Sequence, residues 1–179
     1  METRDFKEGI KQYPLNLRYE RTMMHHLIEH PGDYAGAFRS LSPNLLRLFV
    51  HAYQSRLFNK LLSRRIQGGI KLDEPQEGDV VCFTDAHGGP DTTKLETVTG
   101  KNLPDITFLI RLKRAYVTLP LIGSDTGHDR GRTGEEERRV LDEEGIEAKD
   151  FNVSAMPELA SSGLRREILL RVTPSINAG

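Results

Sequence analysis

Three histidines lie close together near the start of the chain, and two of them have the spacing of a metal site. His26 and His30 are four residues apart, so on a helix their imidazoles would share one face, as in two-histidine zinc sites. Zinc proteases place a glutamate directly after the first histidine, but residue 27 is leucine, and no third ligand stands nearby. We therefore expect no metal site, and we interpret His25, His26 and His30 as surface or helix-end residues.

Two segments rich in glycine and serine invite a chemical interpretation as well. Residues 123–127 contain two glycines, but no lysine follows as in a Walker motif, and no dinucleotide fingerprint is present. The hydroxyls of Ser154, Ser161 and Ser162 lack the strand–turn–helix context that activates a hydrolase serine. From these residues we expect neither nucleotide binding nor hydrolysis, and we assign no catalytic residue and no cofactor.

A stripe of cations is the remaining chemical signal, and it runs along a segment with helical periodicity. Arg56, Lys60 and Arg64 recur every fourth residue, which places them on one face of a helix. Guanidinium and ammonium groups neutralise nucleic-acid phosphates without reading the base sequence. By spacing alone, a solvated helix face explains the stripe equally well. The candidate RNA-binding residues are Arg47, His51, Arg56, Lys60, Arg64 and Arg65.

The composition limits the class of protein in which these residues act. A chain of 179 residues with 37% hydrophobic content can bury one core, and no apolar run approaches the roughly 18 residues that span a bilayer. The N-terminus is charged and has no apolar signal region, and Cys82, the single cysteine, has no partner for an internal disulfide. We expect a soluble cytoplasmic protein. Its net charge of −1 conceals an asymmetry: residues 1–71 carry 12 Lys+Arg against 6 Asp+Glu, while residues 72–179 carry 13 against 20.

The first half of the chain is predicted to be helical. Apolar residues recur at helical spacing over Leu17–His30, with Asn16 as the expected cap, and Asp33 is expected to cap a shorter helix that ends at Phe38. Ser42 and Pro43 then start a long helix that runs to Ile66, before a pair of glycines.

The second half is predicted to combine strands and helices, which gives an α+β fold with one long central helix and a mixed sheet. A Thr-x-x-Glu capping box at Thr133 predicts a helix to Glu144, closed by Gly145. Residues 125–133 are expected to form a mobile loop, and Pro157 to begin a turn. The predicted extended segments are residues 79–84, 108–110, 115–122, 151–153 and 167–172.

Three segments together resemble the TruD family of tRNA pseudouridine synthases, in particular its archaeal and eukaryotic branch. The first is His-Pro-Gly-Asp-Tyr at 30–34, followed by the helix Leu-Phe-Val-His-Ala-Tyr-Gln-Ser-Arg-Leu-Phe-Asn-Lys-Leu-Leu-Ser-Arg-Arg-Ile at 48–66, which is the most specific of the three. The others are Leu-Pro-Leu-Ile-Gly at 119–123 and Glu-Leu-Ala-Ser-Ser-Gly-Leu-Arg-Arg at 158–166, where relatives often have threonine in place of Leu164.

The resemblance implies a parent enzyme that isomerises a uridine of tRNA, typically at position 13, without metal or cofactor. Members of the family use the aspartate of a Gly-x-Lys-Asp motif, and this sequence lacks it: Lys149-Asp150 is followed by Phe-Asn-Val, and the preceding glycine has the wrong spacing. The family's later Gly-x-Tyr-Ala-Thr segment is also absent. The chain therefore resembles the domain inserted into the catalytic domain, with the role of forming one wall of the RNA cleft.

These observations predict an entry segment at residues 1–14, a single insertion domain of the TRUD type at 15–173 and a tail at 174–179. The expected partners are tRNA and the catalytic domain of the same parent chain, with neither membrane nor DNA. On this hypothesis the chain contributes RNA contacts and performs no isomerisation by itself. Two alternatives remain open: a free-standing RNA-binding module, and a structural insert that does not contact RNA.

Overall fold

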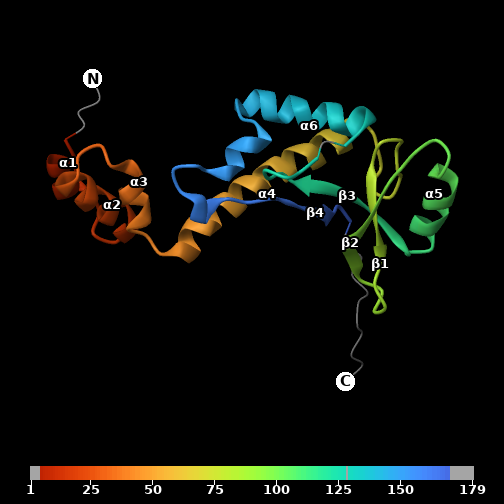
Figure 1. Cartoon of the computed structure of the whole chain (residues 1–179), viewed down its shortest axis with the longest axis horizontal. Helices are drawn as coiled ribbons and strands as arrows, with labels where there is room; N and C mark the ends of the chain where they lie inside the picture. Colours follow the sequence, from red (N-terminus) through yellow and green to blue (C-terminus); the bar gives the residue numbers. More distant parts are fainter. Residues whose placement is uncertain (1–4, 128, 170–179) are drawn as a thin grey trace. The chain divides into compact units, whose positions relative to one another are not determined.

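The computed structural model describes residues 5–127 and 129–169, and the chain divides into two compact units (Figure 1). The helical unit comprises Met1–Tyr53 and Val153–Ala160, and the sheet unit comprises Gln54–Asn152 and Ser161–Gly179. The predicted boundaries of an insertion domain, after residues 14 and 173, stay a prediction, and the second of them lies outside the described residues. No helix in the described part of the chain is long and apolar enough to cross a bilayer.

The helical unit is built from short helices around a small apolar core. Its helices are α1 (Phe6–Gln12), α2 (Arg18–Glu29), α3 (Tyr34–Arg39), the first part of α4 (Pro43–Gln67) and the 3-10 turn η2 (Pro157–Leu159). Pro157 therefore begins a turn, as predicted. The returning segment fills the core of this unit, because Met156 and Leu159 pack with Leu41 and Leu46.

The ends of these helices confirm one predicted cap and correct another. The Asp33 carboxylate accepts the Gly36 N–H at 2.8 Å and so caps α3, as the sequence predicted. The residue that precedes α2 is Leu17 and not Asn16, and no side chain caps this helix. Helix α1 was not predicted, because it is only 7 residues long and buries none of them; Asp5 caps it by accepting the N–H groups of residues 7 and 8.

The sheet unit contains a four-stranded sheet in the order β2-β1-β3-β4, with helices α5 (Leu103–Arg111), α6 (Gly131–Glu144) and the 3-10 helix η1 (Ala148–Asn152). The strands are β1 (Val80–Thr84), β2 (Pro90–Thr97), β3 (Ala115–Leu121) and β4 (Leu164–Glu167). The α+β class is confirmed. All the pairings among the described strands are antiparallel, whereas the sequence analysis expected a mixed sheet.

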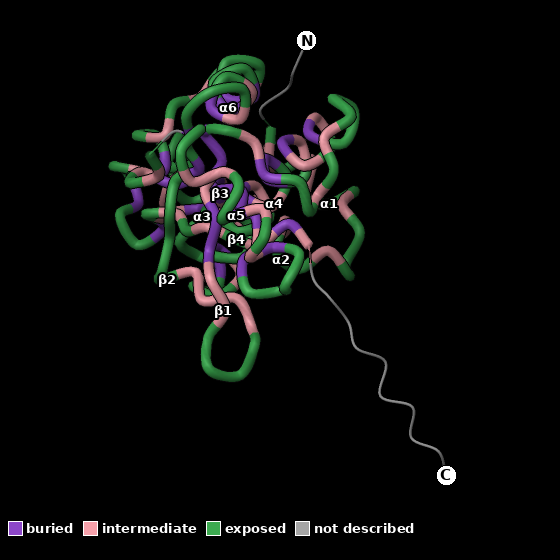
Figure 2. The backbone as a smooth tube through the Cα atoms, turned by 90° about the vertical axis from the view of Figure 1, so that its right-hand side faces the viewer, coloured by how far each residue is buried: buried purple, intermediate pink, exposed green. Residues whose placement is uncertain are grey.

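Strand β3 lies at the centre of this unit and is the most buried of the strands. Val81 of β1 pairs with Val117 of β3, and both side chains are at most 2% exposed. Strands β1 and β3 were predicted within one residue at each end, because buried central strands read as continuous apolar runs. By contrast, Figure 2 shows the turn between β1 and β2 as exposed, at residues 85–88.

Two predicted strands and one missed strand show where local composition misleads. Residues 108–110 belong to α5 and are not extended: Ile106 and Ile110, one helical turn apart, are both buried, and Pro104 stands in the first turn. Residues 151–153 are also not a strand, because η1 covers them up to Asn152. Strand β2 escaped prediction because five of its eight residues are exposed and its sequence, Pro-Asp-Thr-Thr-Lys-Leu-Glu-Thr, is largely polar.

The elements around α6 begin and end differently from the prediction at two points. Helix α6 begins at Gly131, so Thr133 is not its cap; instead its hydroxyl donates to Asp79 at 2.6 Å. Gly145 closes the helix in the left-handed conformation (φ 66°), as predicted. The last strand, β4, lies at Leu164–Glu167 rather than at 167–172, and residues 170–172 of that prediction lie outside the described residues.

The close approach of α6 to the loop before it makes Gly134 irreplaceable. A Cβ at this position would lie 1.7 Å from the backbone oxygen of Asp129, which cannot move aside as a flexible side chain would. We expect Gly134→Ala to destabilise the sheet unit by about 1–3 kcal/mol. Gly9→Ala in α1 is the matched control: a Cβ there meets nothing within 4 Å, and alanine is the better helix former by up to about 1 kcal/mol. Thermal unfolding of both variants measures the contrast, and equal melting temperatures would contradict the predicted close contact.

Candidate nucleic-acid interface

The six predicted RNA-binding residues lie on α4, but the structure divides them into two groups. Arg47 and His51 belong to the helical unit and are exposed. Neither side chain has a hydrogen bond or an ion pair with any residue in 5–127 or 129–169. The other four residues belong to the sheet unit, where each of them is bound to an acidic residue. The even spacing of the stripe therefore does not correspond to one uniform surface.

Arg56 and Lys60 share one glutamate at the end of α6. The Arg56 Nη1 donates to Oε2 of Glu144 at 2.7 Å, and the Lys60 ammonium binds Oε1 of the same carboxylate. The Glu144 side chain is only 9% exposed, while that of Arg56 is 56% exposed. One carboxylate of α6 therefore binds two cations of α4, of which Arg56 is the more exposed.

Arg64 bridges two further glutamates of α6. Its Nη1 lies 3.1 Å from Oε2 of Glu136, and its Nη2 binds Glu143. The basic face of α4 thus packs on the acidic face of α6, and this pairing accounts for part of the charge asymmetry between the two halves of the sequence. The sequence showed the cations of α4 but could not show which face of α6 would lie against them.

Arg65 lies inside the sheet unit and not on its surface. Its guanidinium makes a two-pronged pair with Asp79, with Nη1–Oδ1 at 2.9 Å and Nη2–Oδ2 at 2.8 Å, and the two side chains are 4% and 1% exposed. The Asp79 carboxylate also accepts the Thr133 hydroxyl and the Gln76 N–H. These bonds join α4, the start of β1 and the first turn of α6.

A second buried pair of the same kind joins β4 to the loop that precedes α6. Arg165 of β4 binds both oxygens of Asp129, at 2.6 and 2.8 Å, and its Nε donates to the Thr118 hydroxyl at 2.8 Å. Glu137 of α6 accepts the Asp129 N–H at 2.9 Å and is itself 1% exposed. Burial, and then the neighbouring charge of Asp129, raise the pKa of Glu137 to about 8.

These buried acidic residues were not predicted from the sequence, although one of them has a recognisable sequence pattern. Glu137 falls on the same helical face as Val140 and Leu141, which are buried, and a charged residue on the apolar face of an amphipathic helix indicates a buried polar contact. Asp79 directly precedes the apolar run of β1, which gives no such indication. The partner arginines could not be assigned from spacing, since Arg165 and Asp129 are 36 residues apart.

An aspartate beside an arginine would suggest chemistry on a base only where a base can reach it. The cavity next to Arg65 has a volume of about 20 Å³, and its lining includes Leu61, Ile70 and Leu119. That volume holds about one water molecule. Since every oxygen of Asp79 is hydrogen-bonded, we interpret the Arg65–Asp79 pair as structural.

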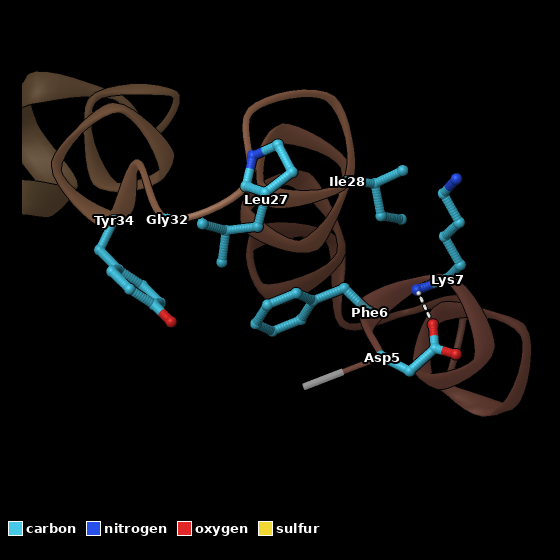
Figure 3. A pocket seen from close by; sticks show the side chains of 8 residues that line it. Asp5, Phe6, Lys7, Leu27, Ile28, Gly32 and Tyr34 are labelled. Atoms are coloured by element: carbon cyan, nitrogen blue, oxygen red, sulfur yellow. Dashed lines mark hydrogen bonds between the residues drawn. The ribbon is translucent and has the colours of Figure 1, made fainter. Parts of the chain in front are cut away.

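The three histidines lie in the helical unit, which also contains a groove. His26 lies 3.0 Å from the carboxylate of Asp33, and its ring centre lies 4.8 Å from that of His30 with the two rings tilted by 46°. The described residues contain no group of three metal-ligating side chains. A groove of about 540 Å³ is lined by Phe6, Leu27 and their neighbours. Figure 3 shows the side chains that line it, together with the bond by which the Asp5 carboxylate accepts the Lys7 N–H and caps α1.

The buried Glu137 should give the protein a pH-dependent stability. In the unfolded chain its carboxyl has a pKa near 4.5, so between pH 4.5 and about 8 the unfolded state loses a proton that the folded state keeps. Stability should therefore fall as pH rises through this window, by an amount on the order of a few kcal/mol, because the charged form would face Asp129 in a buried site. Glu137→Gln should flatten the dependence of the urea unfolding free energy on pH between 5 and 8.

The control is Glu135→Gln, which changes an exposed carboxylate on the same helix and should leave the slope unchanged. A slope that is the same in the unchanged chain and in Glu137→Gln would show that Glu137 does not carry the proton.

The chain matches one family of known proteins over almost its whole length. The model of the family tRNA pseudouridine synthase D (TruD) matches residues 1–178. Two curated relatives of that name are 49% identical over 178 residues, in Methanosarcina acetivorans, and 51% identical over 173 residues, in Methanosarcina barkeri. They cover 99% and 97% of this chain, but the chain spans only 40% of each relative.

A solved structure matches this chain in fold as well as in sequence. The crystal structure titled tRNA pseudouridine synthase D (TruD) from Methanosarcina mazei matches 94% of this chain and 39% of its own chain, with a TM-score of 0.89 and 49% identity. The family match, the identities and the fold agree on one conclusion. The chain belongs to the tRNA pseudouridine synthase D (TruD) family.

Proposed function

We propose that this chain is the RNA-contacting insertion domain of a tRNA pseudouridine synthase, an enzyme that isomerises uridine to pseudouridine in tRNA, typically at position 13. The observation that carries the proposal is the family match over residues 1–178 in a chain that spans about 40% of its relatives' length. The isomerisation is assigned to the remainder of the longer protein, because the Gly-x-Lys-Asp motif of the family is absent from this sequence. The expected site of action is the cytoplasm, and the expected partners are tRNA and the catalytic domain.

The structure narrows which α4 residues are best placed for RNA. Arg47 and His51, four residues apart, share one face of α4 and are exposed and free to approach a phosphate. Arg56 and Lys60 both bind Glu144 of α6, so a contact with RNA would be their second role. Arg64 and Arg65 stabilise the fold, because glutamates of α6 neutralise Arg64 and Asp79 neutralises Arg65.

A structural insert without RNA contact is the competing function, and one observation favours it. The predicted stripe is largely used in packing α4 on α6, so its charge alone does not require a polyanionic partner. The two functions differ in the exposed residues: a structural insert gives Arg47 and His51 no role in binding tRNA.

The 179-residue chain is expected to be inactive by itself. Unmodified tRNA incubated with the 179-residue chain should gain no pseudouridine, because the chain lacks the family's aspartate motif, while the longer protein that contains the motif should convert it. Pseudouridine-specific chemical labelling followed by primer extension locates the product. Conversion by the 179-residue chain would contradict the division of roles, and a longer protein without activity on any tRNA would contradict the proposed enzyme.

The proposed RNA contact of Arg47 can be tested by measuring tRNA binding. Arg47→Gln should weaken the binding of tRNA by this chain and reduce the slope of log K against log salt by about one unit, because one phosphate contact and its counterion release are lost. Arg138→Gln is the matched control, since Arg138 is an exposed arginine on α6 without a side-chain partner among the described residues. Equal losses in both variants would show that only overall charge matters, and no loss in Arg47→Gln would favour the structural insert.

A further inference from the structure

The corner where α5 turns into β3 exposes an unusual group of side chains. Phe108 and Leu112, one helical turn apart on α5, are 60% and 49% exposed. Arg111 lies on the same face of the helix as Phe108, and Lys113 and Arg114 follow directly. All five residues are exposed, and we refer to them as the α5 corner. None of them is among the RNA-binding residues that were predicted from the sequence.

The cations of this corner differ from those of α4 in having no acidic partners. In the described part of the chain, the side chains of Arg111, Lys113 and Arg114 make no ion pair and no hydrogen bond. Three unpaired cations within four residues produce a local positive potential that the net charge of −1 does not reveal. A polyanion is the partner that such a patch fits best.

The acids around the corner lie to one side of it. Arg111 also lines a groove of about 690 Å³, together with Lys71 and the acids Asp73, Glu74 and Glu77. Asp105 is the nearest acid on α5 itself, in the first turn of the helix. The groove would repel a phosphate chain and the corner would attract it, so the polyanion is expected to cross the corner and not enter the groove.

The backbone at Lys113 adds an independent observation. Lys113 is in the left-handed region with φ 60°, a conformation that glycine adopts far more readily. The helix ends in two bonds typical of a glycine-closed terminus: the Lys113 N–H donates to Ile110 O at 3.0 Å, and the Arg114 N–H donates to Leu109 O at 2.9 Å. Helix α6 uses Gly145 in the equivalent place. A lysine at this position therefore costs some stability relative to glycine.

We propose that the α5 corner is a second contact surface for RNA, with Arg111, Lys113 and Arg114 on the phosphate backbone and Phe108 as a platform for an exposed base. The inference rests on the proposed function and adds a site in the sheet unit to the contacts of α4. Exposed cations interleaved with an aromatic ring combine the two contacts that bind RNA without strict sequence preference, namely phosphate neutralisation and stacking.

Replacing Lys113 by glycine is expected to change stability and tRNA binding in opposite directions. Lys113→Gly should raise the melting temperature of the chain by roughly 2–4 °C, because glycine relieves the left-handed conformation, and should at the same time weaken tRNA binding. The double variant Lys113→Gly/Arg114→Gln should lower the salt slope of tRNA binding by about two units. Phe108→Ser should weaken binding at least about fivefold, through lost stacking.

The matched control is the double variant Arg132→Gln/Arg138→Gln, which removes two exposed arginines of α6 and should change binding much less. Equal affinity and equal salt slope in the unchanged chain and the Lys113→Gly/Arg114→Gln variant would overturn the proposal, and so would an equal loss in the control. In those cases the proposed function would stand, because the unchanged chain still binds tRNA. If the unchanged chain binds no tRNA at all, the RNA-contact function itself fails, and this surface fails with it.

A protein partner at the corner is the remaining outcome, and it has a distinct signature. If another part of the longer protein covers Phe108, then Phe108→Ser should destabilise the longer protein, while Lys113→Gly/Arg114→Gln leaves its tRNA affinity unchanged. That combination would overturn the RNA surface in favour of a domain interface.

Discussion

The sheet unit depends on the attachment of α4 to α6 through opposite charges. Three cations of α4 bind three glutamates of α6, and Arg65 continues the contact inward to Asp79. Exposed ion pairs contribute little individually, about 0–1 kcal/mol each. Here, however, the inner end of the row is buried, and breaking a buried pair on one side leaves an uncompensated charge at a cost of several kcal/mol. The charge pattern therefore specifies which faces of the two helices meet.

The two buried arginine–aspartate pairs extend this constraint to the sheet. Arg65–Asp79 fixes the start of β1 against α4, while Arg165–Asp129 fixes β4 against the loop that leads into α6. Both aspartates are bound through both oxygens, and hydroxyls of threonine complete each network, which is the geometry that offsets the desolvation of a buried pair. Glu137 then adds a third carboxyl beside Asp129, and its raised pKa allows the site to hold one acid in the neutral form.

The sequence was informative where periodicity and caps act locally. The long helix from Pro43, the cap at Asp33, the glycine at 145 and the strands β1 and β3 follow from apolar spacing and turn chemistry, and the structure contains all of them. The predictions for short segments were wrong. Phe108 and its neighbours have side chains that favour strands, but the segment is a helix because Ile106 and Ile110 are buried together on one helical face. For the site, the sequence identified the cations of α4 and could not identify their partners, because Arg64 and Glu136 are 72 residues apart.

Net charge is consequently a poor guide to what this chain can bind, and pairing is a better one. Screening in physiological salt limits the reach of an exposed charge to about 8 Å, so an approaching phosphate responds to nearby charges and not to the total. Cations that α6 neutralises stabilise the fold, whereas Arg47 and the three cations of the α5 corner remain available to a ligand. Lys113 also has the left-handed backbone conformation that Gly145 adopts at the end of α6, so it is less favourable for stability than glycine would be there. For a domain that contacts RNA, the unpaired cations and not the conspicuous stripe are the side chains from which its interface should be derived.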